Sequence, residues 1–322
     1  MNVRAYSETT KPTSSGWTGF LHLLIVYIVW GSTYLAIRVA VGQEGGFPPF
    51  TMGALRLLPA GCLLLLGSFL FRQALKLSWQ ELKILAVSGV FLWLGGNGLV
   101  MWAEQYADSG YAALLVGTTP MWVALAEAVL DRKAPAKLLV LSLLSGFAGI
   151  VVLSLPVLRH ASQANILSIT ALLLAPLSWG MGSLLQRRNP VSLSPVVSSG
   201  YQQIFGGLGF AMLALLLGEP MPNPSAEAWW AFVYLVVFGS LLAFTSYIMA
   251  LRLLPTGIVM TYAYVNPVVA VFLGWLILHE PISLWTIGGT TLVLLGVAGT
   301  FRNQNVKVKV NPVTKATATV NK

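Results

Sequence analysis

Two polar steps interrupt long apolar stretches of the sequence and are its first candidates for chemistry. They are Thr119-Pro120 in "LVGTTPMWVAL" and Asn266-Pro267 in "YAYVNPVVAV". A proline removes a backbone hydrogen-bond donor and kinks a helix, and a buried amide needs polar partners. Pro120 and Pro267 are therefore either hinges beside a binding site, with Asn266 contacting the ligand, or kinks that serve packing alone.

An arginine and an asparagine place polar groups in two other apolar stretches. Arg56 lies about two turns inside its stretch, at a depth where charged side chains face a cavity or the bundle interior. It either holds a substrate carboxylate or extends outward to Glu44 or to lipid headgroups. Asn97, in "LGGNGLVMW", faces either a neighbouring helix or a water-filled cavity. Together, Arg56 and Asn97 could bind the two ends of a zwitterion.

Aromatic side chains occur at depth in several of these stretches. A cavity lined by such rings would suit an aromatic or amphiphilic solute, although each ring could equally serve packing. The candidates for substrate contact are Trp30, Tyr34, Trp102, Trp179 and Tyr262.

Several kinds of chemistry lack the residues that they need. Glu127 is the only carboxylate within an apolar stretch, and we expect it to pair with Arg132 and Lys133, so no proton relay at depth is evident. The sequence has no Walker motif, no HExxH and no Ser/His pair that could meet in a membrane. With Cys62 as its single cysteine, it also cannot form a thiolate cage. We therefore expect no catalytic residue, no cofactor and no metal.

The composition is that of a membrane protein. The 322 residues are 56% hydrophobic and only 9% charged, and the mean hydropathy is +0.77. Soluble domains are about a quarter charged. About 20 apolar residues cross a bilayer. We predict ten transmembrane helices, at 19–41, 50–71, 82–102, 109–130, 137–157, 165–186, 195–217, 229–249, 256–278 and 284–301.

The charges predict the orientation of these helices. If the N-terminus is cytoplasmic, most of the 19 lysines and arginines fall on the inner side. The outer loops then carry the acidic residues Glu44, Glu104, Asp108, Glu219, Glu227 and Glu280. Both termini are therefore predicted to be cytoplasmic, and the net charge of +9 reflects this topology rather than a nucleic-acid partner.

The sequence also repeats itself. Gly110 aligns with Gly257, the step Thr119-Pro120 with Asn266-Pro267, and Arg56 with Gln202, which makes Gln202 a further binding candidate. Five helices is an odd number, so the second half must enter the membrane in the opposite orientation, as in many secondary transporters. The fold class is thus an all-α membrane protein of two inverted five-helix repeats around a central cavity. We divide the chain into a tail (1–18), the repeats 19–157 and 165–301, and a second tail (302–322), and we expect both tails to be disordered.

Four segments resemble the EamA family of the drug/metabolite transporter superfamily. They are "WGSTYLAIR", "GNGLVMWAEQ", "SGYAALLVGTTPMWVAL" and "TYAYVNPVVAVFLGWLILHEP". The resemblance covers about residues 20 to 300 and extends to the family's aromatic amino-acid exporters. It implies a monomeric, multi-pass inner-membrane protein in contact with lipid. It also implies a secondary transporter that exports amino acids or related metabolites by alternating access. The alternative is a passive channel for small solutes, which the lack of ionisable coupling residues would also allow.

Overall fold

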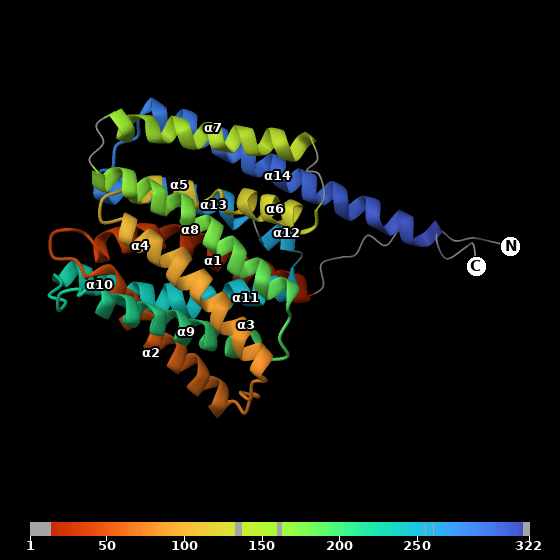
Figure 1. Cartoon of the computed structure of the whole chain (residues 1–322), viewed down its shortest axis with the longest axis horizontal. Helices are drawn as coiled ribbons and strands as arrows, with labels where there is room; N and C mark the ends of the chain where they lie inside the picture. Colours follow the sequence, from red (N-terminus) through yellow and green to blue (C-terminus); the bar gives the residue numbers. More distant parts are fainter. Residues whose placement is uncertain (1–13, 133–136, 160–162, 255, 260, 318–322) are drawn as a thin grey trace.

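The computed structural model describes residues 14–132, 137–159, 163–254, 256–259 and 261–317, and every regular element within these ranges is helical (Figure 1). In chain order the elements are α1 (Ser14–Ala40), α2 (Pro49–Leu70), α3 (Trp79–Gly89), the π-helix η1 (Val90–Gly98), α4 (Leu99–Ala103), α5 (Ser109–Val116), α6 (Thr119–Leu130), α7 (Lys137–Arg159), α8 (Gln163–Arg188), α9 (Pro195–Leu216), α10 (Ala226–Tyr234), the π-helix η2 (Leu235–Ala243), α11 (Phe244–Leu253), α12 (Thr256–Val259), α13 (Tyr262–Leu278) and α14 (Leu284–Thr317).

Carboxylates and serines satisfy the free amides at several helix starts. Glu219 accepts hydrogen bonds from the backbone N–H groups of Phe50 and Thr51 at the start of α2, at 3.0 and 2.6 Å. Ser78 and Glu81 form a capping box on α3, and the Ser194 hydroxyl caps α9. Because no water reaches backbone amides in lipid, such caps fix where each helix can begin.

Seven helical runs of the described chain are long and apolar enough to cross a membrane. They are Trp17–Ala40, Pro49–Leu70, Trp79–Ala103, Ser109–Leu130, Lys137–Pro156, Ile166–Arg188 and Ala226–Ala250. Val265–Leu278 and Leu284–Gly299 are apolar but shorter. Pro195–Leu216 is long but more polar, since it carries two buried serines and the buried Gln202 and Gln203. Large apolar side chains such as Leu66, Phe69 and Leu215 are exposed on the bundle surface, as contact with lipid requires.

The same succession of elements occurs twice along the chain. The spacing from the start of α2 to the start of α9 is nearly the same as the spacing from η1 to η2 and from α7 to α14. The left-handed residues that follow helices recur as well, with Arg72 matched by Gly218 and Arg132 by His279. The helices thus recur at the offset that aligns the two halves of the sequence.

Corresponding helices pack against each other in antiparallel pairs. In α2 and α9, a Cβ on Gly61 would lie 3.0 Å from the side chain of Ile204, and one on Gly207 would lie 2.8 Å from the side chain of Leu58. As the residue number rises along α2, the number of its partner in α9 falls, so the two helices run in opposite directions. Figure 1 shows α2 and α9 on one side of the bundle, and α7 and α14 on the other.

α7 and α14 form the second antiparallel pair, and they lie close enough to contact through glycines. Gly149 approaches the backbone of Val293, and Gly296 approaches that of Gly146. Small residues let helix backbones come this close without a side chain between them. Between the two outer pairs, α1 packs along α13 and α11, and α8 packs along η1 and α6.

The predicted ends of the chain need one correction. α14 continues to Thr317, past the start of the expected tail at 302, and its last turns project from the bundle (Figure 1). At the other end α1 begins at Ser14, inside the expected tail 1–18, and residues 1–13 of that tail lie outside the described residues.

Candidate functional site

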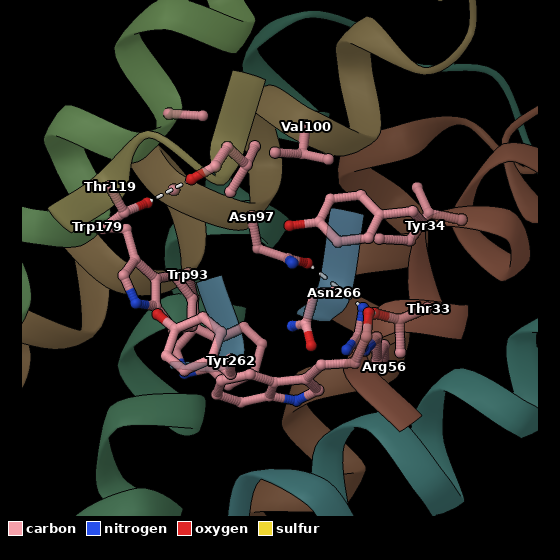
Figure 2. A pocket seen from close by; sticks show the side chains of 15 residues that line it. Thr33, Tyr34, Arg56, Trp93, Asn97, Val100, Thr119, Trp179, Tyr262 and Asn266 are labelled. Carbon is pink, nitrogen blue, oxygen red and sulfur yellow. Dashed lines mark hydrogen bonds between the residues drawn. The ribbon is translucent and has the colours of Figure 1, made fainter. Parts of the chain in front are cut away.

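A polar cavity lies at the centre of the bundle, where α1, η1, α8 and α13 meet (Figure 2). The free volume of this cavity is about 70 Å³, so the site is narrow in this conformation. Its lining consists of Trp30, Thr33, Tyr34, Ile37, Arg56, Trp93, Gly96, Asn97, Val100, Val116, Thr119, Ala175, Trp179, Tyr262 and Asn266.

Arg56 is the charged residue of this lining, and it is 3% exposed. Its Nε donates to the Ser240 hydroxyl at 2.8 Å, and its Nη1 donates to Asn97 Oδ1 at 3.3 Å. The guanidinium also lies 5.7 Å from the centre of the Trp93 ring. No carboxylate of the described residues forms an ion pair with it. Arg56 therefore does not extend to Glu44, and its guanidinium lines the cavity without a carboxylate partner in the described chain.

Asn97 fills the second polar position that the sequence predicts. It lies in η1, whose wider turn and glycines bring the amide to the cavity wall, beside Gly96. Figure 2 shows its amide directed toward Arg56. The sequence leaves open whether Asn97 faces a neighbouring helix or a cavity. In the structure it does both, because it lines the cavity and bonds Arg56 of α2.

The two polar-proline steps meet at the same cavity. α5 ends at Val116, and Thr119 and Pro120 begin α6, so the first step interrupts a helix. In the second half the interruption precedes Tyr262, and Pro267 lies inside α13. Thr119 and Asn266 both line the cavity, and Asn266 Oδ1 is a buried acceptor with no hydrogen-bond partner in the described chain.

Aromatic rings form one wall of the cavity. Trp30 and Trp179, which correspond to each other in the two halves, meet edge to face with ring centres 6.0 Å apart. Tyr262 lies 5.4 Å from Trp30, and Trp93 lies 6.1 Å from Trp179, both in T-shaped arrangements. Such edges and faces can accommodate an apolar side chain or a cation.

Two predicted contact residues lie elsewhere. Trp102 is in α4, one turn beyond Asn97 and Gly98, and its ring packs beside Tyr106 with the centres 5.8 Å apart. Gln202 is fully buried, and its Nε2 donates to the Ser88 hydroxyl at 2.8 Å and to Gln186 Oε1 at 3.2 Å. The repeat pairs Gln202 with Arg56, but these bonds hold its amide against α3 and α8.

Sequence reasoning missed several residues of the site, among them two polar or aromatic lining residues and one that holds Arg56. Thr33 and Trp93 line the cavity, and Ser240 of η2 holds Arg56. Thr33 could have been found, because Trp30, Thr33 and Ile37 follow the i, i+3, i+7 spacing of one helix face. Ser240 carried no such signal, since only the fold brings η2 against α2.

One predicted ion pair differs in the structure, and one acidic residue has an unexpected environment. Glu127 pairs with Arg187, which ties α6 to α8, and not with Arg132; Lys133 lies outside the described residues. Glu104 follows the last residue of α4, in the loop where the sequence places it, but its side chain is completely buried. In the described ranges, no group of three His, Cys, Asp or Glu side chains could hold a metal ion.

A bundle with an apolar surface, membrane-length helices and a polar central cavity is a multi-pass membrane protein built to admit a solute. The chain belongs to the EamA-like transporter family, whose family model matches residues 17–155 and 166–302. It is therefore a membrane transporter and not an enzyme. The two matched segments coincide with the two halves seen in the helix order.

The chain is similar to proteins from several bacteria, two of which are named as transporters. It is 33% identical over 255 residues to the uncharacterized inner membrane transporter YedA of Escherichia coli K12, covering 78% of this chain and 80% of the relative. It is 24% identical to the uncharacterized transporter YoaV of Bacillus subtilis, with 86% and 94% covered, and 28% identical to the protein PecM of Dickeya dadantii, with 79% and 82% covered. A solved crystal structure that is 20% identical shares the fold, with a TM-score of 0.62 over 90% of this chain and 98% of the other.

Proposed function

We propose that this protein is a secondary transporter of the inner membrane that exports amino acids or related small metabolites by alternating access. It acts as a monomer with both termini in the cytoplasm. The observation that carries the substrate class is Arg56, a buried guanidinium beside the cavity with no carboxylate partner in the described chain. A substrate carboxylate would supply the missing charge.

The cavity also offers groups for the rest of an amino acid. Asn266 Oδ1 is an unpaired acceptor that an ammonium group could reach, and the faces of Trp30 and Tyr262 attract cations. An apolar or aromatic side chain would pack among Trp30, Trp93 and Trp179. In this arrangement the carboxylate binds Arg56 and the ammonium binds at Asn266, on the opposite half of the molecule.

Alternating access follows from the relation between the two halves. We infer that ten helices span the membrane as two inverted repeats, with Pro195–Leu216, Val265–Leu278 and Leu284–Gly299 completing the seven longer apolar runs. The antiparallel pairing of α2 with α9 and of α7 with α14 supports this inversion. In an inverted repeat the two halves can exchange conformations around a fixed central site.

Counterflow in proteoliposomes tests the proposal. Vesicles containing the protein are preloaded with a mixed amino-acid pool, and uptake of labelled Phe, Trp, Thr and Met is followed with no pH gradient. Transient accumulation above equilibrium establishes a carrier and identifies the substrate. Uptake that only equilibrates indicates a channel, and no uptake of any of the four contradicts the amino-acid assignment.

Arg56→Gln tests the role of the guanidinium in the same assay. Loss of a charge-assisted hydrogen bond costs about 1.5–3 kcal/mol. The half-saturating substrate concentration should therefore rise roughly 10- to 150-fold. The control is Arg188→Gln, which removes a half-exposed arginine that pairs with Asp131 and does not line the cavity. Equal uptake by Arg56→Gln and the unchanged protein would exclude Arg56 as the carboxylate partner.

A further inference from the structure

Glu104 is a buried carboxyl group that the binding site described above does not use. It follows Ala103, the last residue of α4, and it is 0% exposed. Neither of its side-chain oxygens has a hydrogen-bond partner in the described chain. Burying an ionised carboxylate without partners is so costly that the group takes up a proton instead.

The groups around Glu104 come from two distant parts of the chain. From α1, Arg38 Nη1 donates to the backbone oxygen of Glu104 at 2.5 Å, and Tyr34 is an electrostatic neighbour. From the segment after α13, Glu280 acts on it as a like charge. Burial, and then Glu280, raise the pKa of Glu104 well above its usual range, while Arg38 opposes this shift.

Glu280 itself is held in a different way. Its carboxylate accepts hydrogen bonds from the Ser109 N–H and hydroxyl, both at 2.8 Å, and from the Gly110 N–H at 3.1 Å. These bonds fix it at the start of α5, where it caps the first amides of that helix. The neighbouring Asp108 is exposed, and His279 stands with it at the rim. Glu104 is thus the buried, unpartnered member of this acidic group.

Glu104 lines neither the central cavity nor the outer vestibule, but its neighbours line both. The vestibule has a volume of about 760 Å³, and its lining includes Arg38, Asp108, His279 and Glu280. Tyr34, one turn before Arg38 on α1, lines the central cavity. The carboxyl therefore stands at the partition between bulk water on the side that we assign as outer and the site that would hold the substrate.

We propose that Glu104 is a proton-binding site that controls the outer side of the transporter: protonated, it allows that side to close, and ionised, it favours opening. The proposal rests on the transport function proposed above. It adds the proton as a second ligand, bound at a residue that the sequence analysis placed in an outer loop.

The proton balance of the step is simple. On closing, the Glu104 carboxylate takes one proton from vestibule water and becomes a neutral acid that the apolar surroundings tolerate. On opening, water reaches the group, the O–H bond breaks, and the proton returns to the vestibule. The resulting carboxylate is hydrated, repels Glu280 and lies near Arg38, all of which favour the open form.

Infrared spectroscopy of the purified full chain in lipid nanodiscs tests the protonation without a substrate. A protonated carboxyl group shows a carbonyl stretching band that carboxylates lack. We expect this band at neutral pH, its loss in Glu104→Gln, and its retention in Glu44→Gln, which changes an exposed carboxylate on the same side. A band that is absent, or unchanged in Glu104→Gln, overturns the proposal. A band that persists until the protein unfolds also overturns it, because Glu104 would then be a fixed structural acid.

Thiol labelling tests the opening. In a Cys62→Ser background, Val100→Cys places one thiol in the central cavity, and a membrane-impermeant maleimide is added from outside. The labelling rate is divided by the rate of the same protein with Glu104→Gln, which cancels the ionisation of the thiol itself. If opening releases one proton, this ratio should rise by up to about tenfold for each unit by which the outer pH is raised. A ratio that does not change with outer pH contradicts the proposal.

Neither readout requires an amino-acid substrate, so the two hypotheses can fail separately. If labelled Phe, Trp, Thr and Met all fail in counterflow while the band and the labelling ratio depend on Glu104, the substrate class is wrong and the proton site stands. If counterflow succeeds and is equally sensitive to outer pH in Glu104→Gln, the proton site is wrong and the transport function stands.

Discussion

Arg56 shows how one buried side chain can belong both to the core and to the proposed binding site. Its Nε and one Nη are held by Ser240 and Asn97, which come from η2 and η1. These two bonds orient the guanidinium and stop it from turning toward the membrane surface. What remains of its hydrogen-bonding capacity is directed at the cavity, which is how a site is prepared before the substrate arrives.

Ser240→Ala is expected to destabilise the protein because it removes the acceptor of the Arg56 Nε–H. A buried charged donor without a partner costs about 1–3 kcal/mol. The measurement is the thermal unfolding midpoint in detergent, which should fall. Ser68→Ala is the matched control, because Ser68 is equally buried and its hydroxyl has no hydrogen-bond partner in the described chain. A similar midpoint for the two variants would show that the Ser240 bond contributes little.

The raised pKa of Glu104 predicts how stability varies with pH. Because the folded protein binds this proton more tightly than the unfolded chain, the contribution of Glu104 is complete below the ordinary carboxyl pKa of 4.5. It is lost as the pH rises through the higher folded value. Glu104→Gln should therefore be more stable than the unchanged protein at neutral pH, and the difference in unfolding midpoint should shrink as the pH falls toward 4.5. A difference that does not vary with pH would contradict the raised pKa.

At the scale of elements, the central helices are interrupted where they meet the cavity. η1 and η2 replace regular α-helix in corresponding places, and turns precede α6 and α13. The outer pairs α2–α9 and α7–α14 are continuous and held by close glycine contacts. η1 lines the cavity, Thr119 and Asn266 line it beside the two turns, and η2 lies behind it, where Ser240 bonds Arg56. Irregular backbone thus occurs in and around the cavity, inside the protein, and not in the outer pairs.

Gly149→Ala is expected to disrupt the α7–α14 contact. A Cβ there would lie 2.7 Å from the Val293 nitrogen and 2.8 Å from the Gly289 oxygen, and backbone atoms cannot move aside without separating the helices. We expect a loss of about 1–3 kcal/mol, as for other overpacked sites, measured as a lower unfolding midpoint. Gly67→Ala is the control, because no atom lies within 4 Å of its added Cβ. In that helix alanine should be neutral or stabilising by up to about 1 kcal/mol.

At the scale of the whole molecule, the two halves meet at Pro267. The ring of Pro267 packs against Gly117, at the turn between α5 and α6, with 2.9 Å between an added Cβ and Pro267 Cγ. The proline of one half thus contacts the interruption of the other, and the proposed alternating access would use this contact to couple the two halves.

Pro267→Ala is expected to slow exchange without weakening substrate binding, because alanine restores the hydrogen bond to residue 263 and stiffens α13. The exchange rate in proteoliposomes should fall, whereas the half-saturating concentration should stay within about twofold, well under one factor of ten in affinity. Pro59→Ala is the control, since Pro59 lies inside α2, is exposed, and corresponds to Phe205 in the second half. Equal slowing by both variants would assign the effect to proline in general and not to the Pro267 hinge.

The sequence was informative wherever a signal was local or repeated. The polar-proline steps, Arg56 and Asn97 were found because polar groups are rare in apolar stretches, and the structure brings all of them to one cavity. Gln202 was chosen by symmetry alone, and bonds to α3 and α8 hold it elsewhere. Glu104 was placed in a loop because it follows the last apolar residue of a helix. Its burial depends on α1 and the segment after α13, which are distant in the chain.

The glycine contacts between α2 and α9 are reciprocal. Gly61 meets Ile204 while Gly207 meets Leu58, and these four positions exchange under the same offset that aligns the two halves of the sequence. Reciprocity of this kind defines the isologous interface of a two-fold symmetric dimer. One half of this chain therefore carries both surfaces of the contact between α2 and α9. Two copies of such a half, inserted in opposite directions, would find each other through the same glycines that hold the single chain together.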